Sequence, residues 1–208
     1  MAYISTLVET QIGIFCLWQN LNNDVIIEVQ SYFGGIEMKS IVVVSSQTGN
    51  TLKLASAVAY ALNDNVEAVK VEEKPDIGDY DLVAVGCWIN RGTADARAQE
   101  FIRTIKGKKV AFFATLGAYP DSEHARKSLE NIANLFDESN EIVGRFICQG
   151  SVSYKMVEMM TKMFPKGHPH AMTEERKKRI RDSYSHPDNQ DLINAREYFT
   201  ELKNRLER

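Results

Sequence analysis

Six polar residues and a glycine between two apolar stretches are the strongest candidates for chemistry. Residues 45–51 read Ser-Ser-Gln-Thr-Gly-Asn-Thr and lie between a β-branched run, 41–44, and a stretch with helical periodicity. Backbone N–H groups at the start of a helix and side-chain hydroxyls are the donors that a phosphate monoester needs, and a glycine lets the ligand approach the backbone. The segment therefore predicts a phosphate-binding loop. A helix-capping turn of the same composition is the alternative.

The loop lacks the residues of two common nucleotide-binding motifs. It contains no Lys, which the GxxxxGK[ST] loop of nucleoside triphosphate hydrolases requires. The GxGxxG pattern of dinucleotide-binding folds is also missing. The pattern thus argues against both of these ligand classes.

The elements that position this loop alternate in a regular way. From residue 41 onward, short β-rich apolar runs alternate with amphipathic stretches, which is typical of a parallel sheet with helices on both faces. The sequence therefore predicts a doubly wound α/β fold, a three-layer α/β/α sandwich around a five-stranded parallel sheet. The predicted strands are 41–44, 66–71, 82–86, 110–115 and 142–148, and the predicted helices cover 52–62, 96–105, 125–136 and 191–206.

Residues 46–51, Ser-Gln-Thr-Gly-Asn-Thr, resemble the flavodoxin phosphate-binding signature [ST]-x-T-G-N-T. The similarity in element order covers about residues 38–150 and the closing helix. The resemblance implies the strand order 2-1-3-4-5 and an FMN cofactor whose 5′-phosphate lies in this loop. Carried over by position, it implies hydroxyl donors from Ser46, Thr48 and Thr51, a side-chain amide from Asn50, and backbone N–H groups from Gln47 and Gly49.

The resemblance also implies that the loops after the third and fourth predicted strands hold the flavin ring, at 87–95 and 116–121. Trp88 and Tyr119 are the stacking candidates and Asn90 is the next one by position, while packing at the rim of the core is the alternative role for the aromatic residues. The full set of ring candidates is Trp88, Ile89, Asn90, Arg91, Gly92, Leu116, Gly117 and Tyr119.

Arg91 departs from the acidic surroundings that flavodoxins usually give the flavin. A positive charge close to the flavin N1 would raise the second reduction potential, because it stabilises the anionic reduced form. A side chain in solvent is the alternative. We also expect Gly92, or the turn 90–92, to change conformation and present a backbone carbonyl to the flavin N5.

Residues 151–190 do not fit the alternation, and a structureless loop of that length is unusual in a compact domain. We expect helices at 154–164 and 173–184, and bases exceed acids by five over 155–181. The segment is expected either to dock an acidic redox partner or to form the wall of a substrate pocket. Its apolar set is rich in Met, a residue common on adaptable binding surfaces: Tyr154, Met156, Met159, Met160, Met163 and Phe164.

Three histidines in this region invite a metal interpretation. His168 and His170 flank a proline, and no companion Cys or HExxH pattern accompanies them, so no metal site is predicted. His186 begins residues 186–191, which read as a turn and N-cap for the closing helix.

The chain begins with an acidic segment. Residues 1–37 hold four acids and no Lys or Arg, so the segment accounts for more than the whole net charge of −3. We interpret 1–37 as an N-terminal extension and Met38 as the natural start; an added strand or helix packed on the domain is the alternative. Its apolar run at 12–18 is shorter than the roughly 20 residues that span a bilayer, so no membrane span is predicted.

Composition narrows the function classes further. A pI near 5.9 leaves no overall basic field for nucleic acid. Three widely spaced cysteines fit free thiols in a reducing cytoplasm. The leading hypothesis is therefore an FMN-binding electron carrier between a reductase and an acceptor enzyme, with no catalytic side chains of its own.

Two other functions stay open. One is an FMN-dependent oxidoreductase of the same fold acting on a quinone or tetrapyrrole-like substrate, with residues 151–190 as the wall of its pocket. The other is an interaction module that has lost the flavin, which the intact phosphate loop disfavours.

Overall fold

The structure of the protein is a computed structural model that describes residues 14–21, 24–31, 38–63, 68–164, 168 and 171–208. Contacts within the chain divide it into two units, of which Met38–Leu206 is the larger. The smaller unit contains an antiparallel hairpin of β1 (Ile14–Leu21) and β2 (Asp24–Ser31), with Ile14 opposite Ser31 and Leu21 opposite Asp24. Most of the predicted extension otherwise lies outside the described residues, and the proposal of Met38 as the natural start stays a prediction.

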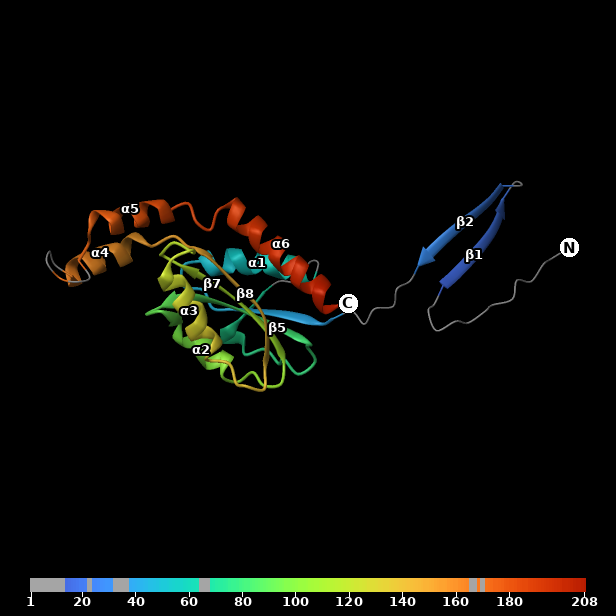
Figure 1. The fold of residues 1–208 in the computed structure, drawn as a ribbon, viewed down its shortest axis with the longest axis horizontal. Coiled ribbons are helices and arrows are strands. Elements are labelled where there is room, and N and C mark those ends of the chain that lie inside the picture. Colours follow the sequence, from blue (N-terminus) through green and yellow to red (C-terminus); the bar gives the residue numbers. More distant parts are fainter. Residues whose placement is uncertain (1–13, 22–23, 32–37, 64–67, 165–167, 169–170) are drawn as a thin grey trace. The chain divides into compact units, whose positions relative to one another are not determined.

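A parallel sheet forms the centre of the larger unit (Figure 1). Its strands lie in the order β4-β3-β5-β7-β8, which confirms the predicted order 2-1-3-4-5. A short β6 adds an antiparallel pair at the end of β5. The strands are β3 (Ser40–Val44), β4 (Val69–Lys70), β5 (Leu82–Asn90), β6 (Thr93–Ala94), β7 (Lys109–Leu116) and β8 (Glu141–Gln149).

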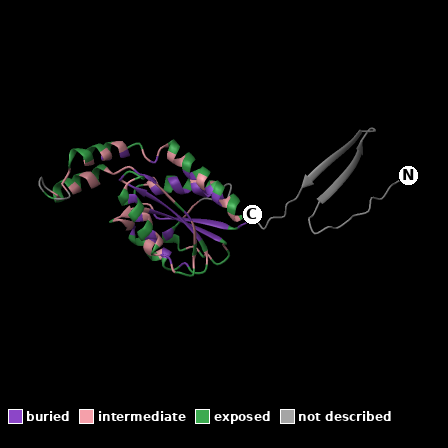
Figure 2. Cartoon of the chain, in the orientation of Figure 1, coloured by how far each residue is buried: buried purple, intermediate pink, exposed green. Residues whose placement is uncertain are grey.

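Helices cover both faces of this sheet, as predicted. On one face α1 (Asn50–Asn63) and α6 (Asn189–Leu206) share a core with Val42 and Phe113; on the other, α2 (Ala96–Ile102) and α3 (Glu123–Ala133) pack against Val43 and Phe112. Side chains of successive strand residues thus point into the cores on opposite faces of the sheet, and this is why these strands are apolar without interruption. Figure 2 shows the strands as the buried layer between exposed helix faces.

Several predicted boundaries were wrong. The helices predicted to end at 105 and 136 end at Ile102 and Ala133, where the chain turns toward the next strand. The second strand, predicted at 66–71, is reduced to Val69–Lys70 within the described residues, and Val71–Glu73 forms a 3-10 turn. The loop predicted at 87–95 is instead strand as far as Asn90, because Trp88 still pairs with Thr115 of β7 and Asn90 pairs with Thr93 in a hairpin. Trp88, Ile89 and Asn90 therefore lie on a strand.

Two helices beyond the carboxyl end of the sheet confirm the helices predicted for the insertion: α4 (Tyr154–Met163) and α5 (Glu174–Ser183). We call them the α4–α5 arm (Figure 1). Ser153 and Thr173 cap their first turns by accepting backbone N–H groups. None of the α4 residues is buried. Among the described residues, no helix is long and apolar enough to cross a membrane.

The predicted turn and N-cap before α6 is confirmed. The Asp188 carboxylate accepts the Asp191 N–H at 3.0 Å, and the Asp191 carboxylate accepts the Asp188 N–H at 2.9 Å. His186 Nδ1 lies 2.5 Å from the same Asp191 carboxylate. These three side chains lie within 4.8 Å of one another, and their bonds serve to hold the start of α6.

Candidate functional site

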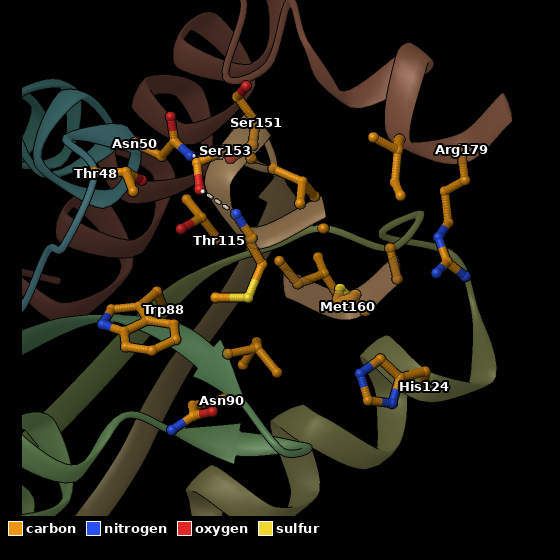
Figure 3. A pocket seen from close by; sticks show the side chains of 18 of the residues that line it. Thr48, Asn50, Trp88, Asn90, Thr115, His124, Ser151, Ser153, Met160 and Arg179 are labelled. Carbon is orange, nitrogen blue, oxygen red and sulfur yellow. Dashed lines mark hydrogen bonds between the residues drawn. The ribbon is translucent and has the colours of Figure 1, made fainter. Parts of the chain in front are cut away.

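A pocket of about 740 Å³ opens where the predicted phosphate loop, the ends of β5 and β7 and the arm meet. This is the carboxyl end of the parallel strands, where doubly wound folds bind their ligands. In Figure 3, Thr48 and Asn50 lie on one side of the pocket, Trp88 and Asn90 below them, and His124 and Arg179 on the opposite side. Ten of the fourteen predicted site residues line it: Gln47, Thr48, Asn50, Trp88, Ile89, Asn90, Arg91, Leu116, Gly117 and Tyr119.

The predicted phosphate loop leads directly into α1. Gly49 has φ +89°, a left-handed backbone that a side chain would strain, and its carbonyl accepts the Lys53 N–H at 3.0 Å. Gln47 and Thr48 are exposed and line the pocket. Ser46 instead accepts the Leu52 N–H at 3.3 Å and, like Gly49, does not line the pocket. The loop therefore combines a helix cap with an open side that faces the pocket.

Asn50 and Thr51 connect the loop to its neighbours. The Asn50 amide donates to the Ser151 carbonyl at 2.9 Å, which ties the start of α1 to the segment that enters the arm. Thr51 is buried and does not line the pocket, but its hydroxyl lies 2.9 Å from the hydroxyl of Thr115 on β7, which does. A Cβ at Gly150 would lie 3.2 Å from the Asn50 amide nitrogen, so the glycine leaves room for this connection.

The hairpin at the end of β5 forms the next wall. Arg91 (φ 52°) and Gly92 (φ 79°) occupy its two-residue turn, and both backbones are left-handed, as a type I′ turn requires. Arg91 is exposed and lines the pocket, whereas Gly92 does not. The Gly92 carbonyl accepts a hydrogen bond from the Asn131 amide at 2.8 Å, so moving this carbonyl toward the pocket would break that bond.

The end of β7 contacts the arm. A Cβ at Gly117 would lie 2.5 Å from Val152 Cγ2, which shows how closely the two segments pack. The Tyr119 hydroxyl donates to the Asp182 carboxylate of α5 at 2.6 Å. This bond to a carboxylate raises the pKa of Tyr119. Tyr119 therefore holds α5 as well as lining the pocket.

The arm supplies pocket-lining residues that are not among the fourteen predicted site residues. Met156, Met160 and Phe164 face the pocket at a spacing of four residues, a helical period visible in the sequence. The other lining residues were not singled out from the sequence, although Ala118 lies in the predicted ring loop 116–121 and six of them lie in residues 151–190, the segment expected as a possible pocket wall. They are Thr115, Ala118, Ser122, His124, Gly150, Ser151, Val152, Ser153, Arg176, Arg179 and Ile180.

The thiols of Cys87 and Cys148 are free, as predicted, and buried. Burial raises the pKa of both thiols far above the usual range, with the nearby Asp95 contributing at Cys87, so neither is a ready nucleophile. Asp95 caps α2 by accepting the Ala98 N–H and accepts a hydrogen bond from Ser45 at 2.7 Å. The hydrogen bond between Ser45 and Asp95 therefore joins the start of the predicted phosphate loop to the start of α2.

Residues 41–200 of this chain match the model of the protein family described as the Flavodoxin domain. The chain belongs to the flavodoxin family. A flavodoxin-like domain-containing protein, BilS of Clostridioides difficile, is 31% identical over 162 residues, covering 76% of this chain and 92% of that protein. BilS of Clostridium symbiosum is 25% identical over 177 residues, covering 74% of this chain and 90% of that protein.

Among solved structures, oxidised flavodoxin 2 of Bacillus cereus matches 80% of this chain and 99% of its own chain, with a TM-score of 0.51 and 15% identity. This likeness shows the fold alone. The family match confirms the resemblance drawn from residues 46–51, and FMN is the cofactor that a flavodoxin domain implies.

The site fits FMN on three observations. Its volume lies within the roughly 300–1,000 Å³ range of small-ligand pockets. Exposed Gln47 and Thr48, beside the left-handed Gly49, stand at the N-terminus of α1, where an anion is favoured. Trp88 and Leu116 supply apolar surface for a flat ring in the same pocket.

Proposed function

We propose that this flavodoxin is an FMN-binding electron carrier that passes electrons from a reductase to an acceptor enzyme. One observation carries the proposal: the described pocket lining contains no Cys, Lys, Asp or Glu. The lining therefore offers no carboxylate base and no thiol or amine nucleophile, and its described groups that could exchange a proton include the imidazole of His124 and the phenol of Tyr119. Chemistry at this site falls to the cofactor, which exchanges the electrons, while the protein binds and orients it.

In this proposal the loop 46–51 binds the FMN phosphate. Backbone N–H groups around Gly49 and the Thr48 hydroxyl would donate to it, favoured by the dipole of α1. Trp88 of β5 and Tyr119 after β7 are proposed to contact the ring, with Asn90 beside them. Arg91 is proposed to stabilise the reduced ring through its positive charge.

The partner enzyme is proposed to contact the outer face of α4. Tyr154 is 78% exposed there, and Met159 and Met163 are also exposed. The arm keeps its excess of bases, although three of its lysines pair with acids of their own helices. These pairs are Lys162 with Glu158, Lys177 with Glu174, and Lys178 with Asp182. We also propose a cytoplasmic location, supported by the free thiols of Cys87 and Cys148.

The test of the carrier proposal uses the FMN-loaded protein, NADPH and a flavodoxin reductase. We expect the bound flavin to be reduced only when the reductase is present and to be reoxidised by a protein acceptor. The control omits the reductase and supplies NADH or NADPH with a quinone alone. Turnover in that control would contradict a pure carrier.

A second candidate is an FMN-dependent oxidoreductase with a small-molecule substrate, such as a quinone or a tetrapyrrole-like compound. The favouring observation is that Met156, Met160 and Arg179 of the arm line the same pocket as the predicted flavin residues. The quinone control above distinguishes this candidate from the carrier.

A further inference from the structure

The imidazole of His124 lines the pocket and has no part in the proposed carrier so far. His124 lies in the first turn of α3 and is exposed. In Figure 3 its ring lies across the pocket from Trp88. A Cβ at Gly92 would lie 3.8 Å from the His124 Cε1 atom, so the ring is beside the turn that ends β5. His124 therefore borders the space proposed for the flavin ring.

No partner within the described chain fixes the protonation state of this imidazole. Among the described residues, no hydrogen bond or ion pair engages either ring nitrogen of His124. Charged residues of the same helix turn pair with other groups: Glu123 with Lys127 at 2.7 Å, and Arg126 with the Asp121 carbonyl at 3.0 Å. A charge that appears in the pocket can therefore change the protonation of His124 without breaking an existing bond.

The other charged or titratable groups of the described lining keep one state near neutral pH. They are Arg91 on the β5–β6 turn, Tyr119 after β7, and Arg176 and Arg179 on α5. Arginine stays protonated in proteins, and the bond to Asp182 raises the pKa of the Tyr119 phenol, which therefore stays neutral. Histidine is the residue type whose charge ordinarily changes between pH 5 and 8.

The size of the pocket keeps His124 close to any ring bound in it. A sphere of 740 Å³ would be roughly 11 Å across, close to the ~10 Å screening length of 0.1 M salt. A negative charge on the ring and a positive charge on the imidazole would therefore stabilise each other. At about 10 Å and an effective dielectric constant of about 20, this attraction moves the titration of the imidazole by about one pH unit.

We infer that His124 takes up a proton when the bound flavin is fully reduced, and so couples the second electron of the carrier to pH. The neutral, one-electron-reduced ring accepts one electron from the reductase and becomes the two-electron-reduced anion, while the neutral imidazole takes one proton from solvent. His124 acts on the ring through its charge alone, and no bond to the flavin forms. The inference rests on the proposed binding of FMN in this pocket.

The first test follows the histidines by NMR in the unmodified, FMN-loaded protein. The Cε1–H signal of His124 is the one missing from His124→Gln, and its titration is recorded with the flavin oxidised and with the flavin fully reduced. We expect its midpoint to rise by about one pH unit on reduction, because the reduced ring is negative. His186, outside the described lining, should keep one midpoint. Equal midpoints for His124 in the two states, or an equal rise at His186, would overturn the inference.

The second test compares the second reduction potential of the wild type with that of His124→Gln from pH 5 to pH 9. The wild-type potential should be the higher one in acid, where the imidazolium favours the anion, and the difference should vanish in base. Titration of the flavin and of its phosphate is common to both proteins and cancels in this difference. His168→Gln is the matched control, at an exposed histidine outside the described lining, and should follow the wild type.

The pH profile separates a charge effect from a structural one. A difference between the wild type and His124→Gln that is absent, or that is the same at every pH, would overturn the inference, as would an equal effect of His168→Gln. These results would leave the carrier proposal untouched, because the protein would still bind FMN and exchange electrons with the reductase. Failure to bind FMN at the start would refute the proposed function and this inference with it.

Discussion

The contact between Gly117 and Val152 gives the sharpest prediction about how the arm closes the pocket. A Cβ at Gly117 would lie 2.5 Å from Val152 Cγ2, whereas ordinary contacts begin at 3.4 Å. In Gly117→Ala the Val152 side chain must therefore move by roughly one ångström, or the arm must shift. Overpacking of this kind costs about 1–3 kcal/mol. We expect a loss of stability in that range, with weaker FMN binding if the arm moves.

Val152→Ala removes the clashing methyl and provides the matched variant. Alone it should cost about 1 kcal/mol, because a half-buried side chain loses two methyl groups. Together with Gly117→Ala it should relieve the strain, so the double variant should be more stable than the sum of the single losses by about 1–2 kcal/mol. Urea unfolding of the four proteins measures this coupling. Strictly additive losses would show that Val152 does not pack on Gly117 and would refute the placement of the arm.

Three further predictions concern other parts of the unit. Arg91→Asn should raise the free energy of unfolding by about 0.5–1 kcal/mol, since Asn tolerates the left-handed turn position better than Arg. The same variant should lower the second reduction potential of the flavin, because it removes a positive charge. An unchanged potential in a redox titration would show that Arg91 does not act on the flavin. The hydrogen bond from the Asp191 N–H holds the pKa of the Asp188 carboxyl below its usual range. The stability that the Asp188 cap gives to α6 should therefore be fully present above the ordinary pKa of Asp, and should be lost as the pH falls through the lowered pKa of Asp188. The advantage of the wild type over Asp188→Ala in thermal unfolding should therefore vanish in strong acid, and a difference that persists there would contradict this role. Finally, a chain beginning at Met38 should fold and take up FMN like the full chain, because Met38–Leu206 forms a unit of its own; the intact mass of the protein from its native cell tests whether Met38 is the natural start.

The central fold was predictable because each strand carries its own signal. Val42, Val43 and Val44 alternate between two cores, and a run buried on both sides is apolar throughout. The helix faces follow the same cores with a period of 3.6 residues. The strand order came from the flavodoxin resemblance, which a signature of six residues was enough to establish.

The end of β5 could not be placed from local sequence. Asn90, Arg91 and Gly92 indicate a loop, and the turn lacks the Asn-Gly or Asp-Gly pair that usually marks a type I′ hairpin. The strand continues because Trp88 pairs with Thr115, a residue distant in the sequence. Strand ends depend on such partners more than on intrinsic propensity.

The arm shows the same division between local and distant signals. Its helices follow from capping residues and periodicity, which are local. Its position over the pocket depends on the bonds from Tyr119 to Asp182 and from Asn50 to Ser151, which join distant residues. Arg179 therefore could not be predicted as part of the pocket from the charge of its segment.

The most direct test of the account compares the binding of FMN and riboflavin to the purified protein by quenching of flavin fluorescence. If residues 46–51 hold the phosphate, FMN should bind in a 1:1 complex and riboflavin at least about 100-fold more weakly, since it loses several charge-assisted hydrogen bonds of about 1.5–3 kcal/mol each. Equal affinity for the two flavins, or no uptake of either, would contradict the account.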